Sequence, residues 1–249
     1  MRIEIPPDVS VDGHLVDGVL GYLTWATGIL FLVAVGVLVV SLVRDRARPG
    51  RATGAYTHGD RRRDQLLTLA VGLIMFFAVD AVLAARAHRA LSDRFWRYPD
   101  GDPRALRVEV TARQWSWTFR TAGPDGRFAT PDDVVTLGEL HVPVGRPIFL
   151  KLRSKDVVHS LYLPNFRTKL DAIPGSTTRM WIEATTPGTY EIGCAQHCGT
   201  SHYKMRGLLV VEPEESYRAW LERAETDSRL RYDAAHPAAA AGWDWEHGS

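Results

Sequence analysis

Four side chains that bind soft metal ions lie within twelve residues in the last quarter of the sequence. The chain's only two cysteines, Cys194 and Cys198, are four positions apart, and His202 and Met205 follow them. Thiolate and thioether ligands favour copper over hard cations. One copper ion needs only one such cysteine, whereas two neighbouring cysteines allow two copper ions to share both sulfur atoms. The spacing therefore predicts a copper centre that transfers electrons.

The residue types alone leave two other roles open for the cysteine pair, a disulfide and a zinc site. A short disulfide is common in extracytoplasmic proteins, but it needs neither the histidine nor the methionine. Zinc takes Cys2His2 ligand sets, although zinc fingers space their histidines closely and zinc has little use for a thioether. A second histidine, His159, lies 35 positions before Cys194. Copper sites on β-sandwiches take one ligand from an early strand and the others from a late loop, so this separation favours copper.

The stretches DVVHSLYLPNFRTKLDAIPG and TRMWIEATTPGTYEIGCAQHCGTSHYKM resemble the CuA domain of cytochrome c oxidase subunit II. The family pattern is a histidine, a gap of about thirty-five residues and then C-x-[EQ]-x-C-x3-H-x2-M, and this chain fits it at every ligand position. The resemblance extends from about residue 15 to residue 225. The motif is highly specific, because a chance match at six ligand positions over such a span is improbable.

The resemblance implies a dinuclear copper centre, CuA, in which Cys194 and Cys198 bridge both metal ions. His159 and Met205 would complete one ion. The other ion would be completed by His202 and by the backbone carbonyl of the residue between the cysteines.

That residue is Gln196, where many family members have a glutamate that helps to bind magnesium at the interface with subunit I. Because a neutral amide is a weaker ligand for Mg²⁺ than a carboxylate, an interface magnesium ion is doubtful in this chain.

Two apolar segments before the copper motif are long enough to cross a bilayer, which takes about 20 residues. Residues 18–43 carry no charge, and residues 65–88 form the second segment. The loop between them, residues 44–64, is rich in arginine, whereas the N-terminal segment 1–17 is mainly acidic. The positive-inside rule places the arginine-rich loop in the cytoplasm. Both chain ends and the copper motif are then expected outside.

The region that holds the ligands, residues 100–212, consists of short β-like runs separated by Gly and Pro turns. We expect an all-β cupredoxin-like (Greek-key) domain after a two-helix transmembrane hairpin. Residues 213–249 should form a C-terminal helix and tail, with Tyr217 and Trp220 on one helical face. The expected strands are 105–111, 114–120, 135–144, 146–153, 178–184, 188–193 and 206–212.

Three residues outside the ligand set are candidates for function through the resemblance. Trp115 matches the tryptophan that receives the electron from cytochrome c, although alternating tryptophans in a strand are commonly packing residues. Asp156 matches an acid that docks the basic face of cytochrome c, but Lys155 replaces a neighbouring acid. Asp64, at the start of the second apolar segment, occupies the place of a glutamate at the mouth of a proton pathway. Asp80 within that segment is interpreted as structural, with proton handling as the alternative.

These features together predict the subunit that takes up electrons for a cytochrome c oxidase. It would accept electrons from cytochrome c or a similar donor and pass them to haem in subunit I, where oxygen is reduced to water. The expected location is the bacterial inner membrane, with the copper domain on the periplasmic face. The alternatives are a CuA subunit of a nitric oxide reductase and a membrane-tethered copper-binding or redox-sensing protein. The net charge of +1 argues against nucleic acid as a partner.

Overall fold

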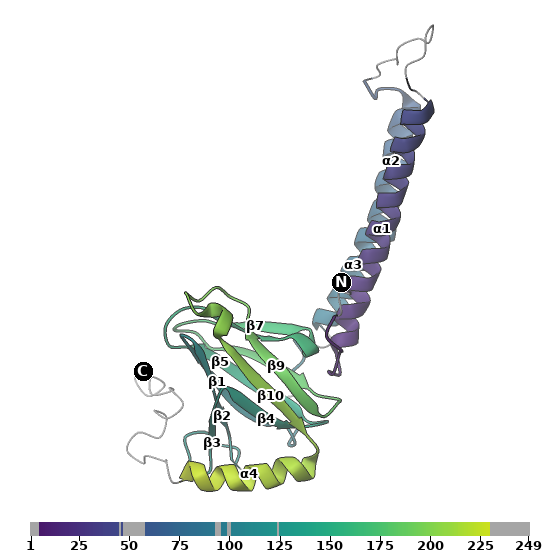
Figure 1. Cartoon of the computed structure of the whole chain (residues 1–249). Helices are drawn as coiled ribbons and strands as arrows, with labels where there is room; N and C mark the ends of the chain where they lie inside the picture. Colours follow the sequence, from purple (N-terminus) through teal and green to yellow (C-terminus); the bar gives the residue numbers. More distant parts are fainter. Residues whose placement is uncertain are drawn as a thin grey trace. The chain divides into compact units, whose positions relative to one another are not determined.

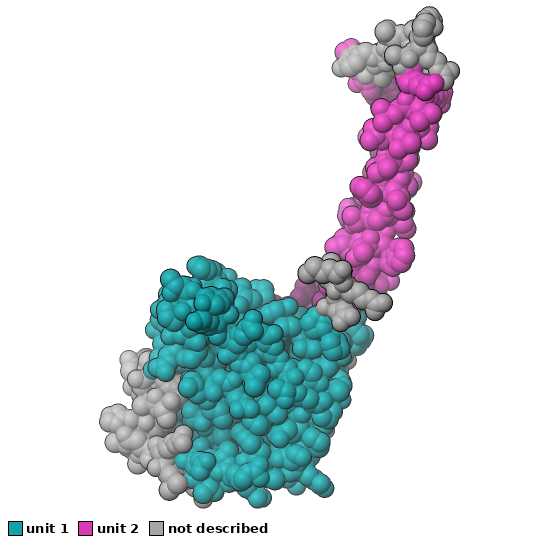
Figure 2. Space-filling view, in the orientation of Figure 1, with its two compact units in different colours: residues 1–14, 97–249 teal, residues 15–96 magenta. Residues whose placement is uncertain are grey.

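The structure is a computed structural model, and it divides into two compact units, which are described separately (Figure 2). Unit 1 comprises residues 1–14 and 97–249, and unit 2 comprises residues 15–96. The residues that the structure describes are 5–44, 46, 58–92, 96–98, 101–123 and 125–229.

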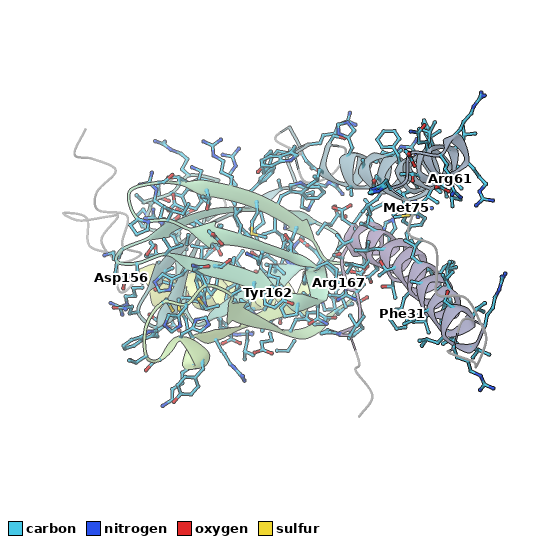
Figure 3. All side chains as sticks on the ribbon, turned by 90° about the horizontal axis from the view of Figure 1, so that it is seen from above. Phe31, Arg61, Met75, Asp156, Tyr162 and Arg167 are labelled. Carbon is cyan, nitrogen blue, oxygen red and sulfur yellow. The ribbon has the colours of Figure 1, made fainter. Side chains whose placement is uncertain are left out.

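Unit 2 consists of two long helical segments (Figure 1). The first is α1 (Gly13–Arg44), and the second runs through α2 (Arg62–Met75), the π-helical turn η1 (Phe76–Asp80) and α3 (Ala81–Ala90). Both segments are long and apolar enough to cross a membrane. Their apolar side chains point outward, as Figure 3 shows for Phe31. The two helices of the predicted fold class are therefore present, whereas the π-helical turn was not predicted.

The two helical segments of unit 2 contact each other through Tyr22. Its hydroxyl donates a hydrogen bond to the carbonyl oxygen of Ala78, which lies in the π-helical turn. The guanidinium carbon of Arg86 lies 5.0 Å from the centre of the same ring. A π-helical turn offers backbone carbonyls outside the regular helical pattern, and such turns are often found at functional positions.

Unit 1 is a sandwich of two five-stranded sheets (Figure 1). The first sheet has the order β3-β2-β1-β5-β8, and the second has the order β4-β10-β9-β6-β7. Each sheet contains one parallel pair, β1 with β5 and β4 with β10. The strands are β1 (Leu106–Arg113), β2 (Ser116–Thr121), β3 (Val134–Leu137), β4 (Glu139–Pro143), β5 (Pro147–Ser154), β6 (His159–Leu163), β7 (Thr168–Ala172), β8 (Thr178–Glu183), β9 (Gly188–Cys194) and β10 (Arg206–Glu212).

The core lies between the two sheets, because alternate residues of each strand point inward. Val108 and Val110 of β1 are buried in the same cluster as Leu161, Ile192 and Leu209 of the other sheet. Burying one such side chain stabilises the fold by about 1.5–3 kcal/mol. This rigid sandwich carries the ligand loop that joins β9 to β10.

The structure differs from the strand predictions at three places, one of which is Trp115, expected in the strand 114–120 but lying in the turn before β2. The predicted strand 135–144 is divided into β3 and β4 at Gly138, whose φ of 71° suits glycine best. The strands β6 and β7 were not among the predicted runs, although they contain the predicted ligand His159. The N-terminal segment also joins unit 1, since Ser10 forms a β-bridge with Ala184 and Val9 is buried.

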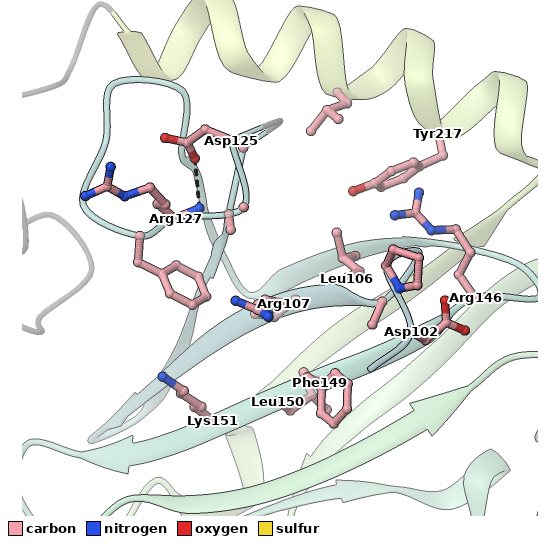
Figure 4. A pocket seen from close by; sticks show the side chains of 18 of the residues that line it. Asp102, Leu106, Arg107, Asp125, Arg127, Arg146, Phe149, Leu150, Lys151 and Tyr217 are labelled. Atoms are coloured by element: carbon pink, nitrogen blue, oxygen red, sulfur yellow. Dashed lines mark hydrogen bonds between the residues drawn. The ribbon is translucent and has the colours of Figure 1, made fainter. Parts of the chain in front are cut away.

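A C-terminal helix, α4 (Glu214–Arg229), follows β10 and packs on the β-domain through its predicted face. Tyr217 is buried, and Trp220 packs against the core cluster. The Trp220 indole also stacks on His141 of β4, with ring centres 4.1 Å apart. A groove of about 1030 Å³ lies between this helix and the strands β1 and β5, with Arg107, Lys151 and Tyr217 among its lining residues (Figure 4).

Candidate metal centre

Four predicted ligands meet where β6, β9 and the loop before β10 come together. Leu161 of β6 pairs with Cys194 at the end of β9, which brings His159 at the start of β6 close to the ligand loop. A short 3-10 helix, η4 (His202–Lys204), then turns the chain so that Met205 points back into the core. We call Cys194, Cys198, His159 and Met205 the soft-ligand cluster.

The sulfur and nitrogen atoms of the soft-ligand cluster lie within a few ångström of one another. The Sγ atoms of Cys194 and Cys198 are 3.8 Å apart, so the cysteines are free rather than bonded as a disulfide. The Sγ of Cys198 lies 3.8 Å from the Sδ of Met205, which in turn lies 3.1 Å from Nδ1 of His159. Candidate ligand atoms of His159 and both cysteines all fall within 4.8 Å of one another.

Two further predicted ligands reach the edge of this cluster. The Nδ1 atom of His202 lies 3.5 Å from the Sγ of Cys198. The backbone carbonyl oxygen of Gln196 lies 3.2 Å from the Sγ of Cys194, while the Gln196 side chain is exposed. All six predicted ligand positions therefore meet in one place, although the role of each as a ligand stays a prediction.

The cluster is largely closed to solvent. His159 is 0% exposed, Met205 is 1% exposed and Cys198 is 2% exposed, whereas Cys194 is half-buried. Such burial leaves the sulfur and nitrogen atoms of the cluster facing one another, away from water. This donor set of two thiols, a thioether and imidazole fits a soft metal such as copper.

The two cysteines differ in acidity because their neighbours differ. Burial alone would raise the pKa of Cys194, but hydrogen bonds with His159 and the backbone lower that pKa to about 6. Burial and then the neighbouring Cys194 charge raise the pKa of Cys198 to about 11. Burial would lower the pKa of His159, but hydrogen bonds to Cys194 and Asp156 raise it. The pair therefore favours one thiolate at neutral pH, and a bound cation would be needed to hold two.

Asp156 orients the most deeply buried ligand. Its Oδ1 lies 2.8 Å from Nε2 of His159, so Nδ1 of the same ring is left facing the sulfur atoms. Carboxylates that fix the ring of a metal-binding histidine are a common supporting feature of metal sites. The sequence reading did not assign this role to Asp156, although an acid three positions before a ligand histidine is a usable signal. Figure 3 shows Asp156 at the margin of the β-domain.

Trp115 lies in the turn between β1 and β2 rather than within a strand, and 37% of it is exposed. Its Nε1 donates to the carbonyl oxygen of Cys198 at 3.3 Å, and the side chain of Gln114 donates to the same oxygen at 2.9 Å. Gly199 permits this approach, because its φ is +118° and a Cβ there would lie 2.9 Å from Nε2 of Gln114 and 3.3 Å from the indole. The indole thus bridges solvent and a cysteine of the cluster, while Trp117 is buried in the core.

The remaining predicted site residue lies far along the chain from the cluster. Asp64 is in the first turn of α2, and its carboxylate lies 4.0 Å from the side chain of Arg63. It belongs to unit 2, whereas the cluster belongs to unit 1. Its proposed part in a proton pathway stays a prediction.

Comparison with known proteins identifies the family. A family model described as cytochrome C oxidase subunit II, periplasmic domain, matches residues 106–212. The alternative cytochrome c oxidase subunit 2 of Bradyrhizobium diazoefficiens is 32% identical, over 89% of this chain and 84% of that protein. The cytochrome c oxidase subunit 2 of Thermostichus vulcanus is 30% identical, over 87% of this chain and 77% of that protein.

Among solved structures, the chain is similar to the periplasmic domain of subunit II of the cytochrome oxidase of Bradyrhizobium japonicum. That match has 26% identity and a TM-score of 0.44, and it covers 49% of this chain and 94% of the other. The two curated relatives match most of this chain, including both the apolar helices and the all-β cupredoxin-like domain. The chain therefore belongs to the cytochrome c oxidase subunit II family.

Proposed function

We propose that this chain is the subunit that takes up electrons for a haem–copper oxidase, at a dinuclear copper centre held by its β-domain. The observation that carries the proposal is the soft-ligand cluster, whose sulfur and nitrogen atoms converge in a nearly closed space. Bound copper would supply the one-electron redox couple. The protein complex that includes haem subunit I, and not this chain alone, would reduce oxygen to water.

The chain's own residues would perform three tasks at this centre. The two cysteines, His159, Met205, His202 and the Gln196 carbonyl would bind the metal. Asp156 would keep Nδ1 of His159 directed at the sulfur atoms by holding Nε2. The buried cage would exclude water, so that little rearrangement accompanies each change of charge.

Trp115 is proposed as the place where an electron arrives. Its ring is partly exposed, and its Nε1 contacts the Cys198 carbonyl. An electron from a docked cytochrome c, or from a similar donor, would therefore have a short path from the protein surface to a ligand. Replacing Trp115 by Phe should slow oxidation of the donor by the assembled complex while sparing the copper spectrum.

The membrane topology is part of the same proposal. Residues 44–64 carry the arginine excess and would lie in the cytoplasm, with the helices 18–43 and 65–88 crossing the inner membrane. The bridge between Ser10 and Ala184 supports this, because it attaches the segment before the first helix to the copper domain. Both would then lie on the periplasmic side.

The test is the electron paramagnetic resonance spectrum of the full chain, purified in detergent and loaded with copper. We expect the hyperfine pattern of one unpaired electron shared equally by two copper nuclei. A mononuclear copper spectrum would contradict the dinuclear proposal. A Cys194–Cys198 disulfide that excludes metal from the native protein would contradict the copper proposal altogether.

A further inference from the structure

Three segments of the chain form the surface around Trp115, which we call the rim. They are the β1–β2 turn with its flanks (113–117), the connection from β5 to β6 (153–158) and the ligand loop (195–204). Backbone contacts join them, since the Lys155 N–H donates to the Ala112 carbonyl at 3.0 Å. The indole Nε1 of Trp115 and the side chain of Gln114 both donate to the Cys198 carbonyl. A protein that approaches the indole must therefore face all three segments.

The rim has an excess of positive charge. One acidic residue, Asp156, stands in the three segments. Three of the basic side chains are exposed, and the fourth is half-buried. The four basic residues of the rim are Arg113, Arg153, Lys155 and Lys204.

The single acid of the rim is turned toward the protein. Oδ2 of Asp156 accepts a hydrogen bond from the backbone N–H of Gln114 at 2.7 Å. Oδ1 accepts from the backbone N–H of Val157 at 2.7 Å and lies 2.8 Å from Nε2 of His159. Both oxygens are thus engaged in organising the site, and this one carboxylate is outnumbered by four basic side chains, which leaves the rim with an excess of positive charge.

The acidic segment of the β-domain cannot compensate, because it lies at the other end of β2. The residues Asp125, Asp132 and Asp133 follow this strand, whereas Trp115 precedes it. Six residues of strand extend about 20 Å. That distance exceeds the screening length of about 8 Å at physiological ionic strength.

Resting on the proposed function, we infer that the electron donor of this chain presents an acidic face around its redox group, not a lysine-rich one. One electron passes from the reduced donor to the oxidised copper centre, and no bond or proton is exchanged in that step. Complementary charge steers such encounters and sets their dependence on salt. The rim therefore selects among donors by the sign of their charge.

Two small oxidants of equal and opposite charge directly test the sign of the charge on the rim. The full chain in detergent is loaded with copper and reduced, and its oxidation is followed by stopped flow with ferricyanide or with tris(phenanthroline)cobalt(III). We expect the rate with ferricyanide to fall about tenfold between low and physiological ionic strength, and the rate with the cobalt cation to rise. The opposite pair of salt dependences would overturn the inference.

Charge reversal locates the effect on the rim. The double variant Arg113→Glu with Lys155→Glu should invert the preference between the two oxidants. The matched control is Arg107→Glu, six residues earlier on the same strand and the same face as Arg113. It should leave both salt dependences unchanged, and an equal effect of the control would overturn the assignment to the rim.

The copper spectrum separates this inference from the proposed function. Each variant is compared only after its spectrum matches that of the wild type, and the wild-type measurement needs no variant at all. Absence of the shared-electron spectrum would refute the proposed function. A normal spectrum together with faster reaction of the cation at low salt would refute only the inference about the donor.

Discussion

The β-domain holds two buried clusters of polar side chains, and they are built on opposite principles. The soft-ligand cluster gathers sulfur and nitrogen atoms of the kind that bind a soft metal ion. The ionic cluster, made of Glu109, Arg120 and Asp133, pairs opposite charges with one another. Converging soft donors are suited to hold a metal ion, whereas paired opposite charges need no ion, so the first cluster points to an external ligand and the second does not.

The contacts of the ionic cluster pair its opposite charges, while Nη1 of Arg120 is buried without a hydrogen-bond partner among the described residues. Nε of Arg120 donates to the Glu109 carboxylate at 2.7 Å, and its Nη2 contacts the same oxygen. Nε also lies 3.8 Å from the Asp133 carboxylate, whose Oδ2 accepts from the Ala129 N–H. The ring of Phe128 lies 5.4 Å from the Arg120 guanidinium carbon. The comparison thus teaches that the side-chain types in a buried polar cluster, converging metal ligands or paired charges, indicate whether the cluster serves function or stability.

The largest effect should follow from removing one sulfur atom of the soft-ligand cluster. In Cys198→Ser a hydroxyl, a harder and poorer bridging group, replaces the thiolate. We expect complete loss of the shared-electron copper spectrum, while the unfolding free energy of the metal-free protein changes by only about 1 kcal/mol. Copper content, the spectrum and urea unfolding in detergent measure these quantities. Thr200→Ala, at an exposed position of the same loop, is the matched control and should keep the spectrum.

If Cys198→Ser retained the shared-electron spectrum, Cys198 would not be a bridging ligand. If it unfolded the metal-free domain, the cysteine would belong with the structural residues, and the contrast between the two clusters would fail.

The ionic cluster should show the reverse pattern, with a loss of stability and no loss of copper. Arg120→Ala leaves Glu109 buried without its cation, which costs about 3–5 kcal/mol of unfolding free energy. Urea unfolding measures this cost, and the copper spectrum of the folded fraction should stay unchanged. Arg107→Ala, an exposed arginine on the adjacent strand, should change stability by less than about 0.5 kcal/mol. A cost below 1 kcal/mol for Arg120→Ala would show that the ionic cluster is dispensable.

The sequence predicted the soft-ligand cluster but not the ionic cluster, for a physical reason. Three members of the soft-ligand cluster lie in one loop, where local spacing alone brings Cys194, Cys198 and Met205 together. The fourth, His159, was a candidate because copper sites on β-sandwiches take one ligand from an early strand, and the resemblance gave it its ligand role. Local spacing could not place it, because its approach depends on the pairing of β6 with β9.

The ionic cluster has no such local signal. Glu109 and Arg120 stand on strands whose alternation of charged and apolar residues is typical of a solvent-facing edge. They become buried only because β1 and β2 pair in a register that sets Glu109 opposite Arg120, and because the segment that follows β2 folds back over them. The pairing register of two strands and the path of the loop that covers them depend on residues far apart in the sequence. The periodicity of a single strand therefore cannot predict them.

Helices and turns likewise differ in how well local sequence predicts them. The apolar helices followed from long apolar runs, whereas nothing in the sequence pattern indicated the π-helical turn at Phe76–Asp80, whose Ala78 carbonyl accepts a hydrogen bond from Tyr22 of the other helix. Trp115 was expected in a strand but lies in a turn, where its contact with the Cys198 carbonyl depends on Gly199.

The smallest expected effect is a pH dependence that belongs to the ionic cluster alone. Burial raises the pKa of Asp133, although the Ala129 N–H and Arg120 act in the opposite direction. An acid with a raised folded-state pKa binds its proton more tightly in the folded protein. Its contribution to stability is fully present below the unfolded pKa of about 3.9 and is lost as pH rises through the folded-state pKa.

Asp133→Asn removes this titration, so the stability of wild type relative to the variant should decrease as pH rises from about 3 toward neutral. Each unit of pKa shift corresponds to about 1.4 kcal/mol, and urea midpoints of the full chain in detergent at a series of pH values measure it. Asp125→Asn, an exposed aspartate before the same turn, is the control and should give a curve parallel to wild type. A relative stability that instead increased with pH would mean that attraction to Arg120 outweighs burial. The ionic cluster would then draw its stability from charge pairing at Asp133 as well as at Glu109.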